Sequence, residues 1–243
     1  MCAHMNMQIV SEREKRLDVG MRANGLKQSV YWITWLIIHT AVVLVNTLIL
    51  IAIGEAVGFT IFRNVSVQVT LTLFFSLGWS MIFVAYFLST LVQKGKTAAV
   101  VSFLVFVVAV FIQLVFSEDK IYIFYSPGQS PTLARVLSFF APFAFTKAYS
   151  DISFHEEYYS WADLYAPVAV HTATADYETT ASIHSINFMM YSVVLFAVLF
   201  WYIDGVFGCG RHPLFFLMPS FYGIRVGSGK ARMYFAIDLF ISQ

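Results

Sequence analysis

The tail of the chain contains a glycine- and lysine-bearing stretch that is close to a nucleotide-binding loop. Residues 224–231 read IRVGSGKA. A phosphate-binding loop has the pattern G-x-x-x-x-G-K-[ST], in which backbone amides cradle phosphates and the last hydroxyl holds Mg²⁺. Gly229 and Lys230 fit this pattern, but Ile224 stands at the first glycine and Ala231 replaces the hydroxyl residue. We therefore expect no ATP-hydrolysing site, no enzyme activity and no bound cofactor in this chain.

The histidines and cysteines do not form a catalytic or metal-binding pattern. Cys2 and Cys209 lie at opposite ends of the chain, and two cysteines are too few for a disulfide framework or a zinc site. The six histidines are scattered, and no Ser-His-Asp arrangement can be placed among them. The sequence predicts no catalytic residue and no metal site.

Three polar side chains interrupt long apolar runs and could form a polar face. His39 and Asn46 lie in the run 31–53, seven residues apart, and Gln113 lies near the end of the run 97–116. Polar groups at membrane depth are costly and face protein or a cavity. They could line a substrate path or form hydrogen bonds between helices. The runs hold no carboxylate or second histidine beside them, which favours the hydrogen bonds.

The composition indicates what must position these residues. Of 243 residues, 59% are apolar and 12% are charged, against roughly 45–50% and about 25% in soluble domains. This excludes a soluble enzyme and a nucleic-acid-binding protein. Four apolar runs are long enough to cross a bilayer as helices: 31–53, 67–92, 97–116 and 184–203. The predicted fold is an all-α, multi-pass integral membrane protein with four transmembrane helices.

The distribution of basic residues predicts the orientation. Eleven of the fifteen Lys and Arg residues lie before the first run, between the second and third runs, or after the fourth. Basic residues are enriched on the cytosolic side, so both termini are expected to be cytosolic. The predicted domains are a cytosolic segment 1–29, a transmembrane domain 30–223 and a cytosolic tail 224–243. Asn64 begins an Asn-x-Ser glycosylation sequon on the outer side.

The outer loop 117–183 contains an apolar segment that is too short to span. Residues 134–148 read ARVLSFFAPFAFTKA, and Pro142 interrupts them. Short apolar segments of this kind are often re-entrant. We expect a re-entrant helical hairpin broken at Pro142. Downstream, Tyr158, Tyr159, Trp161 and Tyr165 are predicted to lie at the level of the lipid headgroups.

An amphipathic cytosolic helix is predicted before the first span. In residues 10–28, Val10, Leu17 and Met21 share one helical face, Ser11 can cap the start, and Gly25 is a stop signal. Such a helix could rest on anionic lipid or dock a soluble partner, and composition does not separate these alternatives.

Four stretches of the sequence, in order, resemble subfamily A ABC transporters. The first is the run EREKRLDVGMRANGLKQSVYWITWL, which resembles the family's first cytoplasmic segment through Glu12, Glu14, Lys15, Leu17, Met21, Gly25, Leu26, Tyr31, Trp32 and Trp35. The second is carried by Leu88, Ser89, Thr90, Lys94, Lys96, Ala98 and Ala99. The third resembles the re-entrant segment through Pro142, Ala144 and Phe145. The fourth is carried by Trp201, Tyr202, Asp204, Val206, Phe207, Pro213, Ser220 and Tyr222.

The resemblance implies the membrane part of an ATP-driven lipid transporter. Residues 12–26 would then be the coupling helix that seats in the ATPase domain, and 134–148 the exoplasmic re-entrant helices. The family's first two transmembrane helices, ectodomain and ATPase domain have no counterpart in this chain, so the implied partners are membrane lipid, an ATPase domain that binds ATP and Mg²⁺, and a second transmembrane half. The alternative is a stand-alone four-helix membrane protein, acting as a channel subunit or a transporter partner.

Overall fold

The computed structural model describes residues 2–15, 20, 24–25, 28–92, 94–116, 118–126, 131–153, 155, 158–171 and 176–208. Four helices in this part of the chain are long and apolar enough to cross a membrane. They are α3 (Gln28–Val57), α5 (Val67–Leu91), α6 (Gly95–Val115) and α9 (Ser182–Ile203). The predicted all-helical multi-pass fold is therefore confirmed. The helix α3 extends beyond the predicted run 31–53 at both ends.

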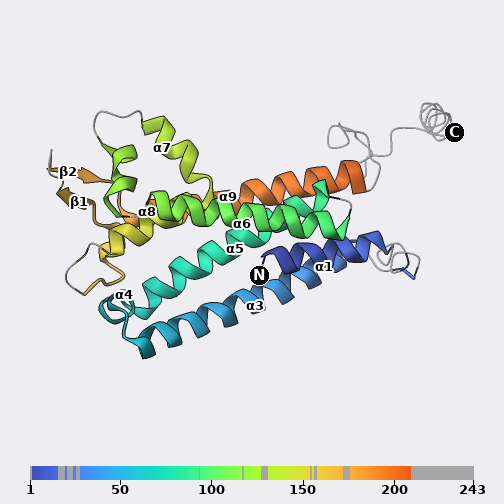
Figure 1. Cartoon of the computed structure of the whole chain (residues 1–243), viewed down its shortest axis with the longest axis horizontal. Helices are drawn as coiled ribbons and strands as arrows, with labels where there is room; N and C mark the ends of the chain where they lie inside the picture. Colours follow the sequence, from blue (N-terminus) through green and yellow to red (C-terminus); the bar gives the residue numbers. More distant parts are fainter. Residues whose placement is uncertain are drawn as a thin grey trace, which may run out of the picture. The chain divides into compact units, whose positions relative to one another are not determined.

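The long helices run back and forth between two ends of the first 200 residues (Figure 1). At one end, which we call the α1 end, the C-terminal turn of α1 (Cys2–Glu14) meets the starts of α3 and α6. At the other, the hairpin end, lie α4 (Thr60–Asn64), η1 (Glu118–Tyr125), α7 (Pro131–Ser138), α8 (Ala141–Ser153) and η2 (Asp163–Tyr165). The strands β1 (Val168–His171) and β2 (Asp176–Thr179) lie there too.

The first helix differs from the predicted one. The helix α1 covers Cys2–Glu14, so Ser11 lies in its last turn, and the predicted start at Ser11 is wrong. Burial of apolar side chains can override a local capping signal. Ile9 and Val10, which precede Ser11, are fully buried within α1. The helix packs along α5 and α6. By its contacts, α1 belongs to the same compact unit as the spans, Met1–Phe200, and the domain division at residue 29 stays a prediction.

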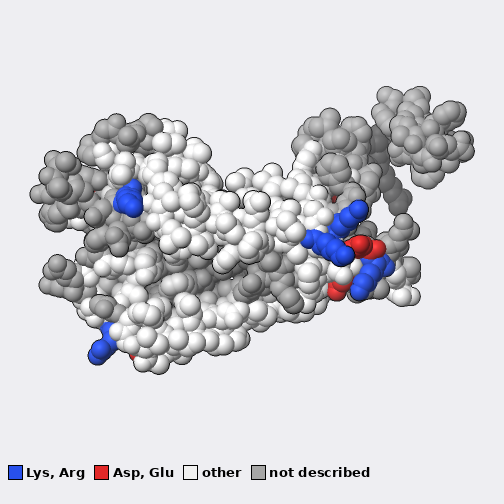
Figure 2. All heavy atoms as spheres, in the orientation of Figure 1, with Lys and Arg blue, Asp and Glu red and all other residues white. Residues whose placement is uncertain are grey.

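The surface between the two ends is apolar. Figure 2 shows charged side chains at both ends of the visible face and none across its middle. Large apolar side chains of α6 are exposed there, including Phe103, Phe111 and Leu114 at 62%, 63% and 69%. The helix α5 has many more buried residues than α6 in the described structure. Such a band is what a bilayer requires of the helices that face it.

A close approach joins α3 to α5. A Cβ added at Gly78 of α5 would lie 2.6 Å from Cγ1 of Val43 in α3. Beside it, the indole Nε1 of Trp79 donates a hydrogen bond to Thr40 at 3.2 Å. The absence of a side chain at Gly78 is therefore what lets the two helices pack at this distance.

The apolar segment 134–148 is broken, but not at Pro142. The break falls at Phe139 and Phe140, between α7 and α8. Pro142 is the second residue of α8. Amides in the first helical turn have no intrahelical acceptor, so the missing N–H of proline costs nothing there. The expected hairpin of two short helices is present, whereas the prediction that Pro142 breaks it is wrong.

The loop 117–183 also contains a small sheet that the sequence did not predict. The strands β1 and β2 pair antiparallel, with Val168 opposite Thr179 and His171 opposite Asp176. Tyr159 is another difference, because it is buried at 2% exposure rather than at a headgroup surface, whereas Tyr158 and Tyr165 are exposed. Tyr159 and Leu164 belong to a core that combines the start of α5, the inner face of α8 and the start of α9.

The chain divides into two compact units after Phe200, and the predicted domain boundary at 223 lies outside the described residues. In the second unit, the described residues are the end of α9 and a short π-helix, η3 (Asp204–Gly208). The predicted tail 224–243, with Lys230 and Ala231, lies outside the described residues.

Candidate functional site

Two glutamates of the predicted coupling helix bond to the membrane helices. Glu12 accepts a hydrogen bond from the hydroxyl of Tyr31, at the start of α3, at 2.9 Å. Glu14 accepts one from the backbone N–H of Gly95, at the start of α6, at 3.0 Å. The side chain of Lys15 is exposed, and Gly25 adopts a positive φ of 89°. Leu17, Met21 and Leu26 lie outside the described residues.

The structure does not assemble the predicted polar face. His39 is buried, and its Nδ1 lies 2.9 Å from the hydroxyl of Tyr86 on α5. Asn46 and Gln113 are exposed on α3 and α6. Four buried positions of α3 instead recur at four-residue spacing: His39, Val43, Thr47 and Ile51. The contact between His39 and Tyr86 is the interhelical hydrogen bond that was the alternative to a polar path.

Removing the hydroxyl that bonds His39 is expected to have a modest effect. Tyr86→Phe should lower the free energy of unfolding by about 0.6 kcal/mol, the average for hydrogen bonds between membrane helices. The measurement is thermal or denaturant unfolding in detergent. Tyr191→Phe is the matched control, because Tyr191 is 56% exposed on α9. Equal stabilities of the two variants would contradict the expectation.

The predicted re-entrant residues lie inside the protein. Pro142, Ala144 and Phe145 are all buried on α8. The ring of Phe145 lies 5.4 Å from the ring of Phe74 on α5, and Ala144 belongs to the same core. The outer surface of the hairpin belongs to α7, where Leu133 and Val136 are exposed. The structure therefore gives α7 the apolar exterior and α8 the interior position.

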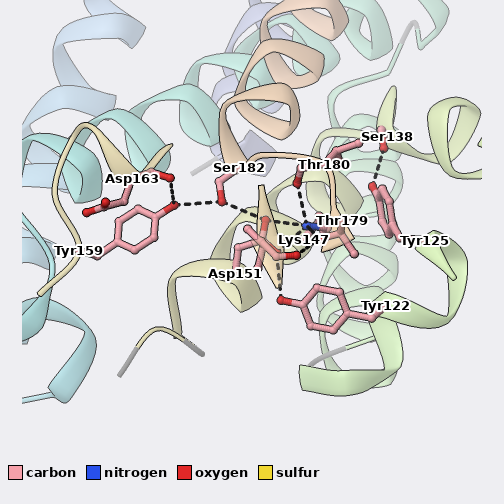
Figure 3. Close-up of polar contacts among 11 residues, drawn as sticks. Tyr122, Tyr125, Ser138, Lys147, Asp151, Tyr159, Asp163, Thr179, Thr180 and Ser182 are labelled. Carbon is pink, nitrogen blue, oxygen red and sulfur yellow. Dashed lines mark hydrogen bonds and ion pairs between the residues drawn. The ribbon is translucent and has the colours of Figure 1, made fainter. Parts of the chain in front are cut away.

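One turn further along α8 lies a buried ionic cluster that the sequence did not predict (Figure 3). The Nζ of Lys147 lies 2.5 and 2.6 Å from the two carboxylate oxygens of Asp151. Both side chains are fully buried. Asp151 also accepts hydrogen bonds from the hydroxyls of Tyr122 at 2.9 Å and Ser182 at 3.0 Å. We call these four residues, with Tyr159 and Thr179, the Lys147 cluster.

The remaining contacts of the Lys147 ammonium come from the sheet and from η1. Nζ lies 3.4 Å from the hydroxyl of Thr179 and 3.5 Å from the carbonyl oxygen of Thr180. It also lies 5.2 and 5.1 Å from the ring centroids of Tyr122 and Tyr125, within the range of cation–π interactions. Acceptors therefore surround the Lys147 ammonium and donors the Asp151 carboxylate, which is the condition for burying an ion pair.

Burial governs the protonation of the cluster. Loss of water lowers the pKa of Lys147 and raises the pKa of Asp151, while the attraction between the two groups acts against both shifts. Burial likewise raises the pKa of Tyr125 and Tyr159. The cluster thus consists of groups that bond to each other and are closed to solvent. Its arrangement suits it to holding segments together rather than to chemistry on a substrate.

Tyr159 extends the cluster to the start of α5. Its hydroxyl lies 3.2 Å from both the Ser182 hydroxyl and the Asp163 carbonyl oxygen (Figure 3). Its backbone N–H donates to the carbonyl of Asn64 at 2.8 Å, and its carbonyl accepts from Ser66 at 2.9 Å. One network therefore connects η1, α8, the sheet, and the starts of α5 and α9.

The sequon lies inside this network. The side chain of Asn64 is half-buried at the end of α4, and Ser66 is the N-cap residue of α5. Val65 between them pairs with Tyr159 in an isolated parallel bridge. The backbone of the sequon is thus already paired within the protein.

A signal for the Lys147 cluster was present in the sequence. Lys147 and Asp151 are four residues apart, the spacing at which side chains meet on a helix. The partners from Tyr122, Thr179 and Ser182 carry no such signal, because only the fold brings them to α8.

The multi-pass helical fold agrees with the comparisons to known proteins. Residues 1–203 match the family model described as ABC-2 family transporter protein, and the chain belongs to this family. It is a transporter membrane component with a multi-pass fold. The matched range includes Tyr31 of α3 and Gly95 of α6, which bond to the glutamates of α1.

The chain is similar to several members of the ABC transporter A family. It is 30% identical over 227 residues to ABC transporter A family member 1 of Dictyostelium discoideum, covering 88% of this chain and 26% of the relative. It is 35% identical over 107 residues to member 9 of Arabidopsis thaliana, covering 44% and 11%. A third relative is cholesterol transporter ABCA5 of Rattus norvegicus, 29% identical over 218 residues, covering 88% and 12%. The chain thus spans about a quarter or less of the length of these relatives.

Proposed function

We propose that this chain supplies part of the lipid-translocation pathway of an ATP-driven transporter. The observation that carries the proposal is the family match over residues 1–203, together with similarity to relatives named as cholesterol transporters. The exposed apolar faces of α3 and α6 support it, because sterol and acyl chains can lie along such surfaces. Lipid is the proposed substrate class.

In this proposal the α1 end faces the cytosol, and so do both termini. Lys15, Lys94 and Lys96 are exposed at that end, and basic residues are enriched on the cytosolic side of membrane proteins. An ATPase domain would approach the same end and bind ATP and Mg²⁺. A second transmembrane half would complete the pathway. The chain itself would supply no nucleotide-binding residue, since its tail lacks the magnesium-binding hydroxyl of a P-loop.

Co-purification tests this proposal. The tagged chain is expressed in its native cells, extracted in mild detergent and reconstituted in phosphatidylcholine vesicles with and without cholesterol. We expect an ABC-type ATPase domain to accompany it, and ATP hydrolysis that cholesterol stimulates and Lys230→Ala leaves unchanged. If no ATPase accompanies the chain and the vesicles conduct ions selectively, the proposal is wrong and the channel alternative holds.

A further inference from the structure

The helix α6 begins without a cap from its own residues. Its N-cap residue is Lys94, whose side chain makes no capping hydrogen bond. The first amides of a helix have no intrahelical acceptor, and the partial positive charge there favours an anion. The N-terminus of α6 therefore needs an acceptor from elsewhere in the chain.

Glu14 supplies this acceptor from 81 residues away. Its carboxylate accepts the N–H of Gly95, the first residue of α6, at 3.0 Å. Gly95 is buried, and a Cβ added there would lie 3.4 Å from the Glu14 carboxylate and 3.7 Å from the Cβ of Ser11. The last turn of α1 is thus packed directly against the first turn of α6.

Glu12 makes the corresponding contact on the other side of α1. Residues two apart on a helix point about 200° away from each other. Accordingly, Glu14 reaches α6, while Glu12 accepts the hydroxyl of Tyr31 from α3 at 2.9 Å. The end of α1 is held between two spans. Upstream, Asn6 adds a second tie to α6, because its amide donates to the Ser102 hydroxyl at 2.7 Å, and both residues are buried.

We propose that Glu12 and Glu14 are positioning residues that clasp the end of α1 between α3 and α6, rather than contacts for an ATPase domain. Displacement of the last turn of α1 would then move the starts of α3 and α6 together. This last step rests on the proposed function, whereas the clasp itself concerns only the present chain. The resemblance to subfamily A transporters had assigned both glutamates to an ATPase-docking helix, and their hydrogen bonds to α3 and α6 motivate the reassignment.

Engineered cysteines test the geometry of the clasp. Cβ atoms about 3.5–4.5 Å apart suit a disulfide, and the Ser11–Gly95 pair falls within this range at 3.7 Å. In a background with Cys2→Ser and Cys209→Ser, we expect Ser11→Cys with Gly95→Cys to form a disulfide under mild oxidation. The control pair, Ser11→Cys with Lys96→Cys, should not form one, because Lys96 is exposed and successive residues of a helix are turned by about 100° from each other. Equal cross-linking of both pairs would overturn the packing of α1 on α6.

Hydrogen exchange tests the role of the Glu14 carboxylate. In Glu14→Ala the Gly95 amide should exchange about tenfold faster or more, because it loses a charge-assisted hydrogen bond. Glu14→Gln keeps an acceptor oxygen and should restore most of the protection. Unchanged exchange in Glu14→Ala would overturn the capping role.

Experiments on the assembled transporter distinguish a positioning role of Glu14 from a docking role. With the partners co-purified, Glu14→Ala should retain the ATPase domain but lose at least half of the cholesterol-stimulated hydrolysis, and Glu14→Gln should recover it. Loss of the ATPase domain itself in Glu14→Ala would make Glu14 a docking contact and overturn the inference. If wild-type chain recruits no ATPase domain, the proposed function fails, while the cross-linking and exchange results still decide whether the clasp exists.

Discussion

Replacing Lys147 with methionine is expected to cost about 3–5 kcal/mol of folding free energy, the range for removing one partner of a buried ion pair. The substitution leaves the Asp151 carboxylate at 1% exposure without its ammonium partner, although Tyr122 and Ser182 still donate to it. Methionine fills much of the volume of the lysine stem, so the loss of folding free energy comes from the missing charge more than from lost packing. Unfolding of the detergent-solubilised protein measures the change.

Two further variants make this expectation specific. Lys147→Met with Asp151→Leu should recover most of the loss, because replacing both members of a buried pair with apolar residues is often neutral or stabilising. Lys120→Met is the control, since Lys120 is an exposed lysine of the same loop, and such surface changes stay within about 0.5 kcal/mol. A Lys147→Met variant as stable as Lys120→Met would contradict the role of the pair.

The second large effect is expected where α3 and α5 meet. Gly78→Leu should destabilise the protein by about 3 kcal/mol, at the upper end of the usual cost of overpacking. Even the first added carbon would lie 2.6 Å from Cγ1 of Val43. Valine is stiff at χ1 and cannot turn away without strain, so the helices must separate. Denaturant or thermal unfolding in detergent is again the measurement.

A rescue and a control accompany this variant. Val43→Ala removes the atom that the new side chain meets, so Gly78→Leu should cost less in that background than in the wild type. Ala41→Leu adds side-chain bulk to α3 at an exposed position and should have little effect. Equal losses for Gly78→Leu with and without Val43→Ala would show that the two residues are not coupled.

The sequence was most informative where the membrane itself imposes a rule. A bilayer requires about 20 apolar residues per helix, and the runs 67–92 and 97–116 correspond to α5 and α6 within two residues at each end. Local signals were less reliable where tertiary packing competed with them. Ser11 looked like a start and Pro142 like a break, yet burial of Ile9 extends α1 upstream, and Pro142 fits the first turn of α8.

The site was predictable only in part, because its partners are distant in the sequence. Glu12 and Glu14 were recognised as significant, but the reach of Glu14 to an amide 81 residues away has no local signature. The same holds for the Lys147 cluster, where Asp151 meets Ser182. An interhelical hydrogen bond of His39 could be expected from the sequence. Its partner, Tyr86, could not be named from the sequence.

The network around Tyr159 and Asp151 also has a consequence for biosynthesis. Asp151 and its donor Ser182 are 31 residues apart in the chain, and synthesis at about 5–20 residues per second separates their emergence by roughly 2–6 s. During that interval Lys147 and Asp151 lack their partners Thr179, Thr180 and Ser182, although Tyr122 and Tyr125 have already been made. The hairpin end can therefore close only when the last span is entering the membrane. A chain that stalls before residue 182 therefore has an ion pair without the hydrogen bond that Ser182 donates to Asp151.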